Sequence, residues 1–142
     1  MSDLDPNDRR AEAARWLDHA VEDIEAIDVC LAAGHPLPGI VAYHCQQAAE
    51  KMVKGLLTVA AAQFPFTHSL KVLGDIAVIH YPHLREVLFR LEPVTAWNTG
   101  FQYPAPRRQG SPVRRPTPDE IQTSLEDVLE LATVLRALMT PT

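Results

Sequence analysis

Apolar residues recur at helical spacing through the first third of the chain. Steps of four and three keep one face of a helix turned inward, and such steps connect Ala13, Leu17, Ala20, Ile24, Ile27 and Leu31. We expect a helix over about 9–33 that ends at Gly34, because glycine is typical of a helix C-terminus. Its outer face is acidic, and we assign to that face Asp18, Glu22, Asp23, Glu25 and Asp28.

A second helix is predicted over about 39–62, after Pro36 and Pro38, which a continuing helix would not accommodate. Its apolar stripe consists of Val41, Cys45, Ala48, Ala49, Met52, Leu56 and Ala60. The opposite side is polar and contains Tyr43, His44, Gln46, Gln47, Glu50, Lys51 and Lys54. From the residues alone we interpret this side as a solvated face with one ion pair between Glu50 and Lys54. A glutamine-rich contact with another helix is the alternative.

The second half of the chain contains further helical patterns around one long irregular stretch. Leu70, Leu73, Ile76 and Ala77, followed beyond Pro82 by Leu84, Val87, Leu88 and Leu91, indicate two short helices or one bent element. Residues 92–118 hold six of the twelve prolines, so we predict a long loop there. The last helix begins at Thr117-Pro118-Asp119-Glu120, which supplies a capping hydroxyl, a proline and an acid three residues after the cap.

These patterns predict one all-α domain over the 142 residues. We expect an up-and-down bundle of four main helices, with one or two short extra helices and a long Pro/Arg-rich loop before the last helix. The acidic, polar start and the absence of an apolar run of about 18 residues predict a cytoplasmic protein with no membrane contact. Cys30 and Cys45 are expected in the core, and the remaining histidines, His19, His35, His80 and His83, show no metal-ligand spacing. We predict no cofactor and no structural metal.

Charge is distributed unevenly along the chain. The net charge of -5 argues against a general nucleic-acid coat. However, residues 98–118 contain no acid and four arginines, Arg107, Arg108, Arg114 and Arg115, which leaves -9 on the rest of the chain. Trp97, Phe101 and Tyr103 are interleaved with this basic segment. They either stack on the bases of a single strand or fix the loop to the bundle while its arginines meet an acidic partner.

The stretch HCQQAAEKMVKGLL, residues 44–57, followed by THSL at 67–70, resembles the signature of HEPN domains. These small helical proteins of prokaryotes share QQAAEKxxKxLL, then a loop, THxL and later an RYP motif. The resemblance implies a bundle of four main helices that usually forms a homodimer. It also implies a frequent partner, a minimal nucleotidyltransferase, in a toxin–antitoxin or regulatory pair. Gln46, Gln47, Glu50, Lys51 and Lys54 then lie in or beside the cleft and dimer surface.

The chain departs from the family pattern at two places. Several HEPN branches are ribonucleases that depend on an arginine, four to six residues, and then a histidine. None of the ten arginines has this spacing, and the nearest pair, Arg15 and His19, has only three residues between. At the RYP position the chain has Gln102 before Tyr103-Pro104, and glutamine lacks the charge and fork of arginine.

Three functions follow as hypotheses. The first is a non-catalytic binding and regulatory module that pairs with a minimal nucleotidyltransferase. The second is a stand-alone nucleotide-binding domain, and the third is a metal-independent ribonuclease that would use His44 or His68, with RNA as substrate. The residues that we expect to bind a nucleotide or partner are His44, Gln47, Glu50, Lys51, Lys54, His68, Tyr103, Arg107 and Arg108.

Overall fold

The computed structural model describes residues 4–34, 37–97 and 116–140. They form five α-helices and two 3-10 helices, and no strand occurs in these ranges. The predicted all-α bundle is therefore confirmed. The elements are α1 (Pro6–Ala32), α2 (Pro38–Val59), α3 (Leu70–His80), η1 (Pro82–Leu84), α4 (Arg85–Leu91), η2 (Glu92–Trp97) and α5 (Pro118–Met139).

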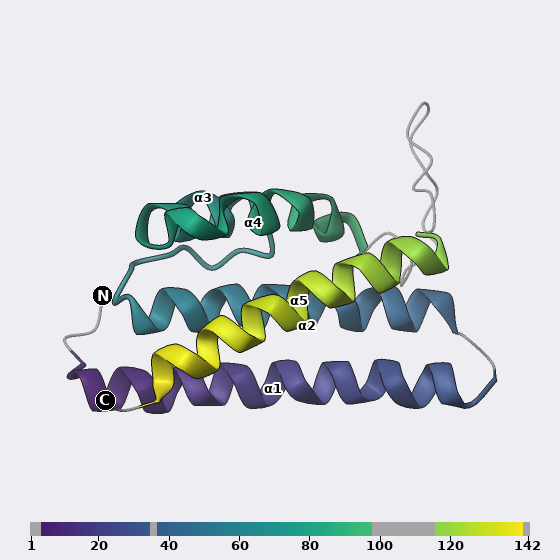
Figure 1. The fold of residues 1–142 in the computed structure, drawn as a ribbon, viewed down its shortest axis with the longest axis horizontal. Coiled ribbons are helices and arrows are strands. Elements are labelled where there is room, and N and C mark those ends of the chain that lie inside the picture. Colours follow the sequence, from purple (N-terminus) through teal and green to yellow (C-terminus); the bar gives the residue numbers. More distant parts are fainter. Residues whose placement is uncertain (1–3, 35–36, 98–115, 141–142) are drawn as a thin grey trace.

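Helix α2 is the centre of the fold. It lies between α1 on one side and the α3–α4 pair on the other, while α5 runs obliquely across α1 and α2 (Figure 1). Fourteen of the eighteen residues from Val41 to Thr58 are buried, because a helix covered on three sides has little surface left for water. The core is completed by Leu73 of α3, Leu91 of α4 and Leu135 of α5.

Local hydrogen bonds and one glycine set the ends of two long helices, and the sequence predicted each of these features except the Asp5 cap. The Asp5 carboxylate caps α1 by accepting the amide of Asp8, and Gly34 follows the helix with a left-handed φ of 76°. At α5 the predicted capping box is present: the Thr117 hydroxyl accepts the amide of Glu120, and the Glu120 carboxylate accepts the amide of Thr117.

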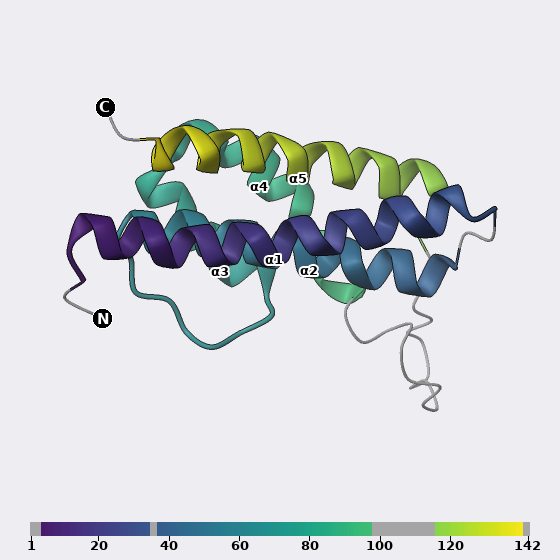
Figure 2. The ribbon, with the colours of Figure 1, turned by 90° about the horizontal axis from the view of Figure 1, so that it is seen from below.

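Helix α2 ends earlier than predicted, at Val59 instead of residue 62. The amide of Ala62 donates to Leu57 and that of Ala61 to Thr58, the hydrogen bonds of a Schellman motif. Ala61 holds the left-handed position with a φ of 58°, where glycine is usual. The chain then leaves α2 and forms a wide loop that projects away from the helices before it enters α3 (Figure 2).

The short helices are separate elements and not one bent helix. Helix α3 is capped by Ser69, and the Thr95 hydroxyl accepts the amide of Leu70 at 2.8 Å. After Tyr81 the chain turns through η1 into α4, and Arg90 of α4 binds Asp127 of α5 through two guanidinium nitrogens. Part of the predicted loop is helical, because η2 covers residues 92–97 and buries Trp97. None of the helices in the described ranges has the length and apolar character needed to cross a membrane.

Candidate functional site

A buried aspartate of α1 holds a histidine and a lysine of α2. The Asp23 carboxylate, only 7% exposed, lies 2.7 Å from Nδ1 of His44 and accepts a 2.7 Å hydrogen bond from Nζ of Lys51. His44 and Lys51 are two turns apart on α2 and therefore face the same way. Asp23 was predicted on the exposed acidic face of the first helix, and that prediction was wrong because α2 covers it.

A second carboxylate, that of Glu50 in α2, lies within hydrogen-bond distance of three side-chain nitrogens. It accepts hydrogen bonds from Nε2 of Gln46 at 2.8 Å and from Nζ of Lys54 at 2.7 Å, and Nδ1 of His68 lies 3.0 Å from it. Gln47 extends the arrangement by donating to the side-chain oxygen of Gln46 at 2.7 Å. We call these two clusters together the polar seam; its members are Asp23, His44, Gln46, Gln47, Glu50, Lys51, Lys54 and His68.

The interpretation of this helix side as a solvated face was wrong for its central residues. Gln46 is 0%, Glu50 4% and Lys54 6% exposed. The ammonium group of Lys54 lies 5.5 Å from the ring centre of Trp16 on α1 and 5.8 Å from that of Phe66. Aromatic rings thus complete its surroundings through cation–π contacts. The predicted Glu50–Lys54 pair is present, but it is a buried pair.

Burial and hydrogen bonding act in opposite directions on Glu50. Burial by itself raises the pKa of Glu50, but the hydrogen bonds from Lys54, His68 and Gln46 outweigh it, so the pKa lies below its usual value. The carboxylate is therefore ionised at neutral pH. Each lysine of the seam faces one carboxylate, so the seam has no excess positive charge when its histidines are neutral. A phosphate that bound through these lysines would have to compete with the two carboxylates.

The two histidines of the seam share one geometry. Both direct Nδ1 toward a buried carboxylate, Asp23 for His44 and Glu50 for His68. Because an ionised carboxylate only accepts, Nδ1 of each ring carries a proton, and in the neutral ring Nε2 then has the lone pair. This tautomer could accept a proton from a bound molecule. The nearest cations that could stabilise developing negative charge, Lys51 and Lys54, are already held by the same carboxylates.

Six of the nine predicted site residues meet in the seam: His44, Gln47, Glu50, Lys51, Lys54 and His68. Tyr103, Arg107 and Arg108, as well as the Phe101–Pro104 motif, lie outside the described residues. His68 lies one residue before Ser69, which caps α3.

Sequence reasoning missed two contributors from α1, Asp23 and Trp16. A signal for Asp23 was available, because it lies three residues after Ala20 and four before Ile27. Both of these are fully buried, and the spacing places Asp23 close to the inward stripe.

The cysteines lie away from the seam's hydrogen bonds. Cys45 is buried as predicted, and burial raises the pKa of its thiol to about 12, which removes the reactive thiolate at neutral pH. Cys30 is only partly buried and packs against the core. Within the described ranges, no three side chains of histidine, cysteine, aspartate or glutamate are grouped as a metal site requires.

One comparison with known proteins identifies the chain. The family model described as "HEPN domain" matches residues 13–138, which include all of α2 to α4, most of α1 and α5, and every member of the seam. No curated protein and no solved structure matches the chain.

Proposed function

The chain belongs to the HEPN family, and from this premise we propose that it is a non-catalytic binding and regulatory module. We propose that it forms a homodimer in the cytoplasm and pairs with a minimal nucleotidyltransferase in a toxin–antitoxin-type system. The observation that supports this most is the pairing of every carboxylate and lysine of the polar seam within the chain. A site whose charged groups hold one another serves the stability of the module better than it serves a reaction.

The basic segment supports a protein partner. Four arginines without an acid between 98 and 118 offer a charge-complementary surface to an acidic protein, which would speed the encounter and orient the complex. The remainder of the chain is strongly acidic. The basic segment would therefore attract acidic surfaces, and the rest of the chain would attract basic ones.

The test is a pull-down of the tagged chain from its native cells, followed by mass spectrometry and a light-scattering mass of the eluted complex. We expect a small nucleotidyltransferase in a defined ratio. The double variant Arg107→Glu/Arg108→Glu should lose it. The control Arg15→Glu/Arg136→Glu changes the net charge equally at exposed positions on α1 and α5 and should retain it. Absence of such a protein from the eluate of cells that encode one would contradict the proposal.

Two other functions are less well supported. A stand-alone nucleotide-binding role would use Lys51 and Lys54 around a phosphate, yet both ammonium groups already lie 2.7 Å from carboxylates. A ribonuclease would use His44 or His68 as its base, and the seam orients both suitably, but the family's arginine is missing from the required spacing. RNA cleavage that persists in EDTA and disappears in His44→Ala or His68→Ala would support the ribonuclease hypothesis.

A further inference from the structure

The outward side of α4 carries a charge, an apolar ring and an opposite charge in sequence. Arg85, Phe89 and Glu92 are four and three residues apart, and Glu92 continues the helical backbone beyond Leu91, so the three lie on one stripe. Phe89 is 69% exposed. We call Arg85, Phe89 and Glu92 the α4 stripe.

Both charged ends of the α4 stripe are available. Within the described part of the chain neither Arg85 nor Glu92 forms a hydrogen bond or ion pair through its side chain. Glu92 is near enough to Lys71 to add to the rise in its pKa, but Asp75 causes most of that rise. Lys71 is bound to Asp75 at 2.9 Å. Lys71 and Asp75 of α3 thus hold each other, whereas the side chains of Arg85 and Glu92 have no ion-pair partner among the described residues.

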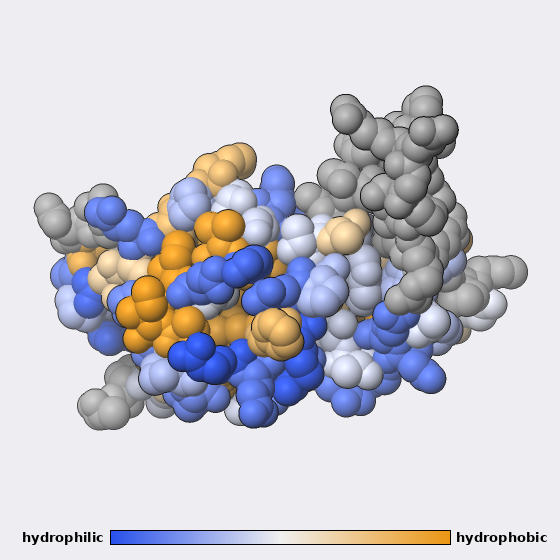
Figure 3. Space-filling view, turned by 90° about the horizontal axis from the view of Figure 1, so that it is seen from above, coloured by the Kyte–Doolittle hydropathy of each residue, from blue (hydrophilic) through white to orange (hydrophobic). Residues whose placement is uncertain are grey.

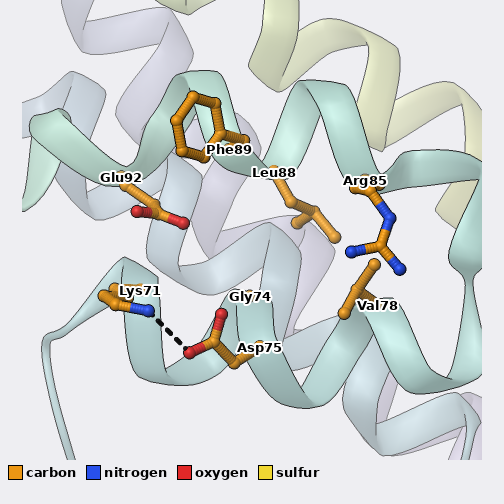
Figure 4. Close-up of a pocket in the computed structure, with 8 residues that line it drawn as sticks. All are labelled: Lys71, Gly74, Asp75, Val78, Arg85, Leu88, Phe89 and Glu92. Atoms are coloured by element: carbon orange, nitrogen blue, oxygen red, sulfur yellow. Dashed lines mark hydrogen bonds and ion pairs between the residues drawn. The ribbon is translucent and has the colours of Figure 1, made fainter.

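Apolar and charged side chains lie together beside this stripe. A groove of about 320 Å³ separates α3 from α4, with Arg85 beside Val78 toward one end and Glu92 beside Lys71 toward the other (Figure 4). On α3, Ile79 is 75% exposed and Val72 is also exposed. Apolar side chains accordingly gather over the α3–α4 part of this face of the molecule (Figure 3). A group of exposed apolar side chains with charges beside it is typical of an interaction site.

We propose that the α3–α4 face binds a second copy of this chain about a two-fold axis that runs across the two helices. This rests on the homodimer of the proposed function and names its surface. A two-fold axis in this direction reverses the order of the stripe, so Arg85 of each copy meets Glu92 of the other and the two Phe89 rings meet between them. An isologous interface needs such self-complementarity, and the stripe provides it without help from another element.

The other candidate surfaces are less suited to a second copy. The polar seam has its charges bound within the chain, so it offers no charge to a partner protomer. The end of the α1–α2 hairpin exposes Val29 and Ile40, but its exposed charges on α1 are the acids Glu25 and Asp28. Two-fold pairing there would bring like charges together, which is unfavourable.

The experiment uses charge reversal and mixing, with the mass of the purified full chain measured by light scattering across a concentration series. Wild type should be a dimer. In R85E both ends of the stripe are acidic and in E92R both are basic, so each variant alone should dimerise at least about tenfold more weakly. An equimolar mixture of tagged R85E with untagged E92R should form a heterodimer, because in that pair every contact again joins opposite charges.

A matched apolar pair completes the test. Ile79→Asp should weaken the dimer, whereas Val29→Asp, at the similarly exposed end of the α1–α2 hairpin, should leave it intact. A monomeric wild type, undiminished dimers of both charge variants, or a mixture that stays monomeric would each overturn the proposal. A monomeric wild type that still captured a nucleotidyltransferase would overturn this surface and leave the proposed function in place.

Discussion

The polar seam and the α4 stripe use the same helical spacing for opposite purposes. In the seam, Glu50 and Lys54 are four residues apart and bind each other in the interior. In the stripe, Arg85 and Phe89 are also four apart, and the charge stays at the surface without a partner in the described chain. Spacing therefore tells which side chains share a face, and the neighbouring elements decide whether that face is closed or left for another molecule.

The neighbours of the seam close it from both sides. Asp23 arrives from α1 and His68 from the segment before α3, so each lysine or carboxylate of α2 finds an opposite group. No described element covers the α4 stripe in the same way, although α3 and α5 pack against other sides of α4. The seam should accordingly contribute to stability and the stripe to association, and the predictions below separate these roles.

The largest expected effect comes from removing one charge of the seam. Lys54→Met leaves the buried Glu50 with only Gln46 and His68 as donors. Breaking a buried pair in this way should reduce the free energy of unfolding by about 3 kcal/mol. The control is Lys71→Met, which removes the exposed Lys71–Asp75 pair and should leave the stability almost unchanged. Urea unfolding followed by circular dichroism measures both, and equal losses would show that the seam is not a closed interior network.

Two helical glycines should respond to alanine with opposite signs. A Cβ at Gly55 in α2 would lie 2.7 Å from a methyl carbon of the fully buried Leu135. Crowding of about 1–3 kcal/mol should exceed the helix-propensity gain of about 1 kcal/mol, so Gly55→Ala should destabilise the protein by about 1 kcal/mol. At Gly74 in α3 the nearest atom would be 3.7 Å away. Gly74→Ala should stabilise by about 0.5–1 kcal/mol, and the same sign for both would contradict this packing.

A smaller gain is expected at Ala61, the residue that directs the chain toward His68. Its left-handed φ of 58° carries about 1–2 kcal/mol of strain for a residue with a Cβ. Glycine relieves this strain but gives the unfolded chain more freedom, worth about 0.4–1 kcal/mol. Ala61→Gly should therefore raise the free energy of unfolding by about 0.5 kcal/mol. Thermal unfolding at neutral pH measures this change. A lower stability of Ala61→Gly would contradict the left-handed conformation of Ala61.

The smallest effect is a pH dependence due to Glu50. Its pKa is lower in the folded protein than in the unfolded chain, so the unfolded state binds its proton first as the pH falls. The stability from Glu50 is complete above the unfolded pKa, about 4.3, and is lost as the pH falls through the lower folded pKa. In Glu50→Gln the slope of stability against pH should be shallower in this acid range. An unchanged slope would contradict a lowered pKa of Glu50 in the folded protein.

Much of this fold could be predicted from the sequence because its signals are local. The helical steps from Ala13 and the cap at Thr117 involve residues within one or two turns of each other, and both were confirmed. The end of α2 was misjudged because Ala61 takes a conformation that its residue type does not announce. The seam was recognised as a set of residues, but its burial depends on Asp23 and His68, which lie far from their partners in the sequence.

The α4 stripe could not be recognised from the sequence in the same way. Its pattern of arginine, phenylalanine and glutamate is ordinary for a short amphipathic helix, whose apolar stripe of Leu84, Val87, Leu88 and Leu91 was predicted. Its meaning depends on which charges remain without a partner after folding, and only the structure shows that Lys71 is bound to Asp75.

Calorimetric titration of nucleotides into the wild-type chain at low salt tests the central claim most directly, namely that the seam is closed and the module acts through protein contacts. Lys51 and Lys54 are held by Asp23 and Glu50, so we predict no saturable heat from nucleoside mono-, di- or triphosphates. Saturable binding that disappears in Lys51→Met and persists in the control Lys71→Met would contradict the account. It would show that a phosphate can displace Asp23 and would make nucleotide binding the function of the seam.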